Sequence, residues 1–104
     1  MFERRNVSTD EAVLVVGGSL SGDATAEFQR QIEELAAGPC KTITLNLSGT
    51  ATINSSALGK ILLFRKKLGE QDRTLRIRGC SDLLLNTFKM IKFDTLISIE
   101  KEIS

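Results

Sequence analysis

The chain has 104 residues, a formal net charge of +1, 41% hydrophobic residues and 26% charged residues, which fits one globular domain and excludes a fibrous or wholly disordered protein. A charge this close to zero argues against direct nucleic-acid binding, and no apolar run approaches the roughly 18 residues needed to cross a bilayer. Because the N-terminus also lacks an apolar signal core, we expect a single domain over residues 1–104 that acts in the cytoplasm without contacting a membrane.

Two strands are predicted at the start of the chain. The apolar run Ala12–Val16, rich in valine and stopped by two glycines, indicates a central strand that is buried on both faces. Residues 2–8 (FERRNVS) have a weaker and shorter strand pattern. We expect them to pair with the first run as an antiparallel edge strand, across a turn at residues 8–10.

A helix and a third strand follow. Apolar residues recur at steps of four, three and one between residues 24 and 37, which predicts a helix packed on one side and ended by Gly38-Pro39. Residues 41–47 (KTITLNL) alternate apolar and polar side chains as a half-buried strand does, and the run 48–54 breaks this strand. The apolar stripe of the helix consists of Phe28, Ile32, Leu35 and Ala36.

The second half of the chain alternates helices with strands. We predict a helix over residues 55–68 closed by Gly69, a strand over 74–79 (TLRIRG), a helix capped by Ser81 and a last strand over 95–100 (TLISIE). The inward-facing residues are Leu58, Ile61, Leu62 and Leu68 in the first of these helices, and Leu84, Phe88 and Ile91 in the second.

This order of elements predicts an α/β fold. Three strand-helix-strand units require parallel strand pairs with right-handed crossovers, whereas the opening pair of strands can be antiparallel. We therefore expect a mixed five-stranded sheet with an antiparallel first strand and about three helices.

The residue types that most catalytic and metal sites need are missing. The chain has no histidine, which removes the commonest general base and metal ligand. Its two cysteines, Cys40 and Cys80, can neither close a zinc site nor form a disulfide scaffold. Gly17 and Gly22 have the spacing of a phosphate-binding loop, but no lysine follows them. We therefore expect no metal, no cofactor and no enzymatic activity.

Two adjacent serines, Ser55 and Ser56, lie where the third strand leads into the second helix. In an α/β sheet such a loop leaves the carboxyl end of its strand, where functional residues usually gather. With Asn54 as N-cap, both serines fall in the first turn, beside the positive end of the helix. Either they only begin the helix, or one of them is placed for modification, since this helix end would stabilise a phosphate.

The same helix presents one side that is a candidate docking surface. Residues 60–78 hold seven basic and two acidic side chains, whereas residues 1–38 hold three basic and seven acidic ones. This asymmetry either decorates two solvated helices or creates a charged surface for a partner. The side in question carries a row, spaced four, three and four residues apart, of Ser56, Lys60, Leu63 and Lys67.

Two stretches of the chain resemble a known family. LNLSGTATINSSALGKIL (residues 45–62) resembles the signature of STAS domains, particularly that of bacterial anti-sigma factor antagonists, and GGSLSGDATAEF (residues 17–28) is similar to the loop before the first helix in that family. Together with the order of elements, the resemblance covers nearly the whole chain. The family pattern usually has three acidic residues and a glycine at the positions of Ser21, Asn46, Asn54 and Ala57.

The resemblance implies a protein that is switched by phosphorylation. In that family the second serine of the pair, which is Ser56 here, accepts the phosphate, and Ser55 supports the turn. The unphosphorylated protein binds an anti-sigma factor that is also a serine kinase and so frees a sigma factor, and a serine phosphatase resets it. The resemblance thus predicts an anti-sigma factor antagonist without a cofactor, whose partner-binding residues are Ser21, Asp23, Asn54, Ser55, Lys60, Leu63 and Lys67.

Two other functions stay open on the sequence. The chain could be a STAS-type interaction module of another assembly, such as a lipid-transport or sensory complex, in which Ser56 only begins a helix. Alternatively, Ser56 and Lys60 could form a serine-lysine nucleophile, although this lysine would need burial to lose its proton.

Many members of the family that the sequence resembles add a final helix where this sequence has only EKEIS. We therefore expect the last edge of the sheet to be either uncovered or closed by a homodimer.

Overall fold

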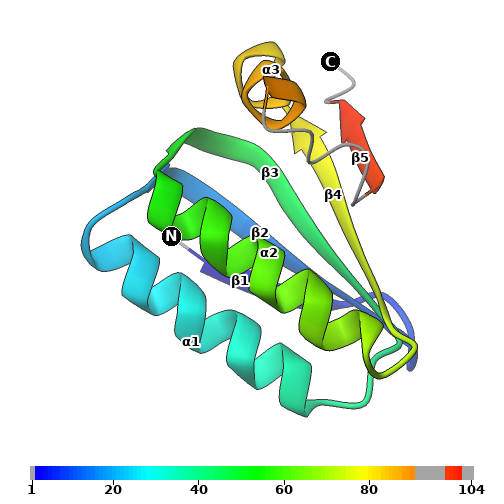
Figure 1. Cartoon of the computed structure of the whole chain (residues 1–104). Helices are drawn as coiled ribbons and strands as arrows, with labels where there is room; N and C mark the ends of the chain where they lie inside the picture. Colours follow the sequence, from blue (N-terminus) through cyan, green and yellow to red (C-terminus); the bar gives the residue numbers. More distant parts are fainter. Residues whose placement is uncertain (1, 91–97, 102–104) are drawn as a thin grey trace.

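The computed structural model describes residues 2–90 and 98–101 and shows helices packed on a mixed sheet (Figure 1). The strands lie in the order β1-β2-β3-β4-β5, with β1 antiparallel to β2 and the later pairs parallel. The predicted α/β fold, with three helices and an antiparallel first strand, is confirmed. The elements are β1 (Phe2–Asn6), β2 (Glu11–Leu20), α1 (Asp23–Ala37), β3 (Thr42–Ile53), α2 (Ser55–Gly69), β4 (Thr74–Cys80), α3 (Asp82–Met90) and β5 (Ser98–Lys101).

One face of the sheet is covered by α1 and α2, which lie side by side (Figure 1). Because the strand order follows the chain order, right-handed crossovers place successive connecting helices on the same face. The core lies between this face and the helices, and Phe2 of β1 stacks on Phe28 of α1 with ring centroids 6.3 Å apart. The sheet contributes Ala12, Leu14, Val16, Ile43, Leu45, Leu47, Leu75 and Ile77 to it.

The second strand, β2, is longer and less buried than the sequence predicts. Burial alternates along it, and the valines that point to the other face, Val13 and Val15, are only half-buried. The prediction of burial on both faces is therefore wrong. The glycines do not stop the strand, which runs on to Leu20 with irregular pairing around them. β2 has a neighbour on each side, but β3 is the middle strand of the sheet.

The third strand, β3, also continues beyond its predicted end. Residues 48–54 were expected to break it, yet it pairs with β2 as far as Ile53, which lies opposite Leu20. The buried Thr50 hydroxyl donates to the Val16 carbonyl at 2.7 Å. Because β2 also runs on past its glycines, the small polar residues of β3 find backbone partners there and need no apolar alternation to stay extended.

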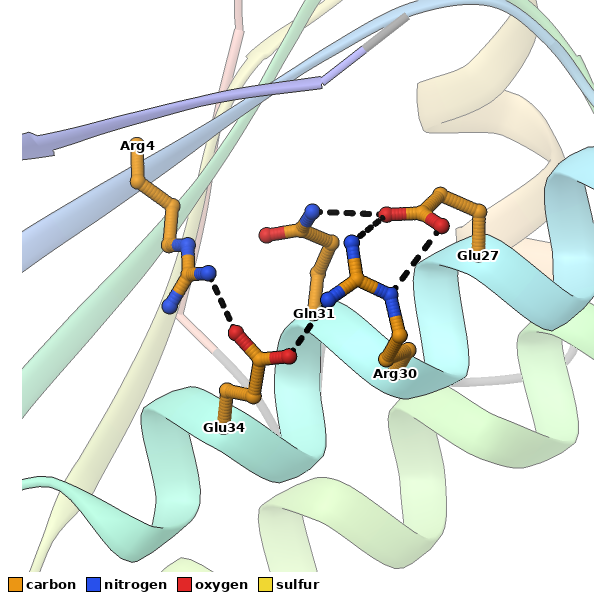
Figure 2. Close-up of polar contacts among 5 residues, drawn as sticks. All are labelled: Arg4, Glu27, Arg30, Gln31 and Glu34. Carbon is orange, nitrogen blue, oxygen red and sulfur yellow. Dashed lines mark hydrogen bonds and ion pairs between the residues drawn. The ribbon is translucent and has the colours of Figure 1, made fainter.

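The first helix, α1, buries its predicted stripe and ends at Gly38 as expected. A polar network joins it to β1: Arg4 donates to Glu34, Arg30 donates to Glu34 and Glu27, and Gln31 donates to Glu27 at 2.7 Å (Figure 2). The hydrogen bond from Arg4 holds the pKa of Glu34 below its ordinary value, and the hydrogen bond from Arg30 does the same for the pKa of Glu27.

The carboxyl end of α1 is held by Arg73, which lies in the loop before β4. Its guanidinium group donates to four backbone carbonyls at and just after the end of the helix. The last carbonyls of a helix lack the usual amide partner four residues on, and a cation also suits the negative end of the helix dipole. The four carbonyls that accept from Arg73 belong to Leu35 (3.2 Å), Ala36 (2.6 Å), Gly38 (3.1 Å) and Cys40 (2.8 Å). The Leu35 carbonyl also accepts from the Gly38 amide at 3.1 Å.

The second helix, α2, begins and ends within a residue of its predicted bounds, with Gly69 as its last residue. Ile61 and Leu68 are buried as expected, but Leu62, predicted to face inward, is 39% exposed. The helix packs on the sheet on one side and against α1 on another, and the side chains that it buries instead are Ala57 and Phe64.

The third helix, α3, starts as predicted, because the Ser81 hydroxyl accepts a hydrogen bond from the Leu84 amide at 3.3 Å. Leu84 and Phe88 are buried, whereas Ile91 lies outside the described residues. The last strand was predicted over residues 95–100. The structure has β5 over Ser98–Lys101, and residues 95–97 lie outside the described part.

Both cysteines are free and buried. Burial raises the pKa of the Cys80 thiol to about 11, so this thiol is protonated at neutral pH. Among the described helices, none is long and apolar enough to cross a membrane.

Candidate functional site

The carboxyl ends of β2 and β3 meet at one edge of the sheet, where α1 and α2 begin (Figure 1). The two strands are parallel, with Leu20 opposite Ile53, and the Asn54 amide donates to the Leu20 carbonyl at 3.1 Å. Both loops that the sequence singled out therefore lie at the edge where α/β folds usually hold their functional residues.

The start of α2 has the arrangement that the sequence predicts. Asn54 is the N-cap, and its side-chain oxygen accepts a hydrogen bond from the Ala57 amide at 2.8 Å. Ser55 and Ser56 occupy the first turn, and both are exposed. A hydroxyl there is accessible to another protein and lies beside the positive end of the helix dipole.

The start of α1 forms the neighbouring part of this edge. Its N-cap, Gly22, has a positive φ of 58° and no side chain with which to cap the first amides. Ser21 and Asp23 flank this glycine and are exposed. The structure thus brings both predicted partner-binding residues of the first loop to the same sheet edge as the serine pair.

A shallow hollow of about 360 Å³ lies between the two helix starts. Lys60 of α2 lies at this hollow, and its ammonium group donates to Gln29 Oε1 of α1 at 2.6 Å. We call this site the N-terminal hollow. It is lined by Gly22, Thr25, Ala26, Gln29, Asn54, Ser56 and Lys60.

A second depression, of about 170 Å³, continues between the helices away from the N-terminal hollow, and we call it the helix groove. Leu63 at this groove is 67% exposed, an unusual state for a large apolar side chain. Lys60 lines both the hollow and the groove. The groove is lined by Gln29, Ile32, Glu33, Ala36, Lys60, Leu63, Phe64 and Lys67.

The predicted row on α2 therefore follows two adjacent depressions, which share Gln29 and Lys60 as lining residues. Ser56 and Lys60 line the first, and Lys60, Leu63 and Lys67 line the second. The α1 residues that complete them were not predicted, because their proximity to α2 depends on how the two helices pack. One signal was present for Thr25, a hydroxyl that precedes Phe28 by three residues on the apolar stripe of α1.

The site offers an accessible hydroxyl at Ser56. The chain has no histidine that could act as a base for Ser56. The ammonium group of Lys60 donates to the Gln29 amide oxygen of α1. The exposed Ser56 hydroxyl is open to a group that another protein transfers.

The family model described as "Mlab, STAS domain" matches residues 4–98. No curated protein sequence matches the chain significantly.

Solved structures with the same fold include the anti-sigma factor antagonist SpoIIAA in its unphosphorylated form, which is 17% identical, with a TM-score of 0.78 over 100% of this chain and 90% of that one. The phosphorylated form of SpoIIAA, a Bacillus cell fate determinant, is 18% identical, with a TM-score of 0.77 over 98% and 93%. The Thermotoga maritima protein TM1081 is 19% identical, with a TM-score of 0.86 over 98% and 87%. At these identities the structural likeness concerns the fold, and the family match, which spans most of the sequence, shows that the chain belongs to the STAS-domain family.

Proposed function

We propose that this STAS domain is an anti-sigma factor antagonist that acts in the cytoplasm and is switched off by phosphorylation of Ser56. The unphosphorylated chain binds an anti-sigma factor that is also a serine kinase, and a serine phosphatase reverses the modification. The observation that carries the proposal is the position of Ser56. It is exposed in the first turn of α2, at the head of the surface that runs through the N-terminal hollow into the helix groove.

The partner docks along this surface. Leu63 supplies an exposed apolar contact, and the helix groove beside it has apolar walls formed in part by Ile32 and Phe64. Lys60 and Lys67 flank Leu63 on α2, so a partner surface with acidic groups around an apolar centre complements this side.

Phosphorylation ends this contact without unfolding the domain. Ser56 Oγ forms a bond to the γ-phosphorus of ATP as the bond to ADP breaks, and the kinase takes up the hydroxyl proton. The new group adds a charge of about −1.5 to −2 and is strongly hydrated, so a partner packed over Ser56 would have to desolvate it. The positive end of α2 stabilises the same charge within the chain, which leaves the fold intact.

The proposal is tested by incubating the purified chain with ATP and each candidate anti-sigma factor kinase from its own cell. We expect the mass of one phosphate to be gained, and mapped to Ser56. Ser56→Ala should abolish this gain, while the matched variant Ser55→Ala, one residue away and also exposed, should retain it. Phosphate transfer that persists in Ser56→Ala, or its absence with every such kinase, would contradict the proposal.

A further inference from the structure

The N-terminal hollow contains a buried hydroxyl group without a hydrogen-bond partner. Thr25, in the first turn of α1, lines the hollow and is only 7% exposed. No group of the described residues pairs with its Oγ1 atom. A buried hydroxyl without a partner costs about 1 to 3 kcal/mol, so it has the capacity to donate to an acceptor that enters the hollow.

The other groups around the hollow favour an anion. α1 and α2 both begin here, which brings two positive helix ends to the hollow. The start of α1 has no side-chain cap, and its Ala24 and Thr25 amides donate to the Ser21 and Gly22 carbonyls. Lys60 adds a full positive charge. Asp23, the acidic residue in the first turn of α1, is exposed and does not line the hollow. The hollow, of about 360 Å³, is shallow and open, which leaves room for a phosphate group.

Ser56 lines the same hollow, with its hydroxyl at the start of α2. We propose that the N-terminal hollow is a phosphate seat, in which the phosphate carried by Ser56 is held within the chain by the Thr25 hydroxyl, the Lys60 ammonium group and the N-terminus of α1. This inference rests on the proposed function, because it requires that Ser56 be phosphorylated, and it adds how the modified state is held.

Binding of the Ser56 phosphate in the N-terminal hollow also changes the docking surface along α2. Lys60 exchanges its hydrogen bond with Gln29, which is 2.6 Å long in the unmodified chain, for a charge-assisted bond to phosphate. The Lys60 ammonium group, which lines both the hollow and the helix groove, is then paired with the phosphate. The partner therefore loses a contact with this charge and also meets the phosphate. The modification thereby acts on the groove as well as on Ser56.

The test uses the whole chain with phosphoserine installed at position 56 during synthesis, so that no kinase is needed. Phosphorus NMR then gives the second pKa of the phosphate, which is ordinarily about 6. We expect a lower value, because the seat stabilises the dianion, and we expect Lys60→Gln to raise it again by about half a unit or more.

Lys66→Gln is the matched control, since it removes the same charge from the same helix at a position about 15 Å along the axis from Ser56, whereas Lys60 is about 6 Å from it. We expect it to leave the pKa unchanged, because salt screens that distance at physiological ionic strength. An ordinary pKa in the unaltered sequence, or equal effects of Lys60→Gln and Lys66→Gln, would overturn the seat. A chain that no kinase phosphorylates would contradict the proposed function but not this measurement.

Thr25→Val tests the buried hydroxyl separately, because valine keeps the shape and removes the donor. The unmodified variant should be at least as stable as the parent, because the substitution removes a buried hydroxyl that has no hydrogen-bond partner and so destabilises the folded chain. The phosphorylated variant should lose stability relative to the phosphorylated parent, which a purely structural role of Thr25 would not produce. Equal changes in both forms would count against the seat.

Inorganic phosphate distinguishes the source of the bound group. Added to the unmodified chain, it should shift the amide resonances of Gly22 and Thr25, and these shifts should disappear in the phosphorylated chain because its own phosphate fills the hollow. Equal shifts in both forms would show that the Ser56 phosphate lies elsewhere. If neither form shifted, the hollow would not admit phosphate, and the proposal would be wrong.

Discussion

Asn54 fixes the start of α2 with a neutral side chain, at a position where the family pattern that the sequence resembles has an acid. Its amide oxygen accepts from the Ala57 amide at 2.8 Å, the same bond that a carboxylate would accept. The helix start is therefore preserved, while the surroundings of Ser56 carry one negative charge fewer. At this residue the sequence predicted both the cap and its geometry, because capping depends only on neighbours along the chain.

The proposed switch at Ser56 can be imitated by a charged side chain. Ser56→Asp should weaken binding to the anti-sigma factor by about tenfold or more, which corresponds to about 1.4 kcal/mol, because the partner would bury an unpaired carboxylate. Its thermal midpoint should hardly change, since the residue is exposed and an acid suits the first turn of a helix. Calorimetric titration with the partner gives the affinities, and Ser56→Asn, similar in shape but uncharged, is the control. Equal affinities of the Asp and Asn variants would argue against a charge-based switch.

Gly79 in β4 is the position where a single methyl group should cost most. Its φ is 76°, and an added Cβ would lie 2.9 Å from Asn46 Oδ1 and 3.0 Å from the backbone nitrogen of Ser48. Gly79→Ala should therefore lower the free energy of unfolding by about 2 to 4 kcal/mol, measured by urea denaturation. At Gly59 in α2, an added Cβ would have nothing within 4 Å. Gly59→Ala should therefore raise the free energy of unfolding by up to about 1 kcal/mol. Similar effects of both substitutions would contradict this account.

At the scale of elements, Arg73 joins the end of α1 to the start of β4. Lysine keeps the charge but cannot reach four carbonyls, so Arg73→Lys should lower the free energy of unfolding by about 1 to 3 kcal/mol. Arg5→Lys makes the same change in an exposed ion pair of β1 and should cost less than about 0.5 kcal/mol. Chemical denaturation of both variants gives their free energies of unfolding. If Arg73→Lys lowered this free energy no more than Arg5→Lys does, the four hydrogen bonds of Arg73 would add nothing to stability.

The network between β1 and α1 makes stability depend on acid. Hydrogen bonds from Arg4 and Arg30 lower the pKa values of Glu34 and Glu27 in the folded chain, so these carboxylates bind protons less readily there than in the unfolded chain. Their contribution is present above the ordinary carboxyl pKa of 4.5 and is lost as the pH falls through the lowered folded values. Thermal midpoints between about pH 6 and pH 3 should fall less steeply for Glu34→Gln than for the parent. Arg4→Gln should flatten the profile in the same way, and an unchanged slope in either variant would contradict this origin.

For the whole molecule, the fold class followed from periodicity, but strand lengths and the full site did not. The glycines and small polar residues of β2 and β3 look like strand ends, yet each strand supplies the backbone partners that keep the other extended. Which of two apolar residues, Leu62 or Phe64, α2 buries depends on where α1 packs. Gln29 is placed beside Lys60 by that same packing of the two helices, and no spacing within one segment of sequence encodes such a neighbour.

The strand order β1-β2-β3-β4-β5 bears on how the chain assembles as it is made. Every strand pairs with the one synthesised just before it, so each new segment meets a partner that has already left the ribosome. Pairings between neighbouring segments also close shorter loops than a shuffled strand order would, which lowers the entropic cost of each step. At a synthesis rate of about 5 to 20 residues per second, β2 and β3 can be paired before β4 emerges, so the surface that carries Ser56 can form while the rest of the sheet is still being translated.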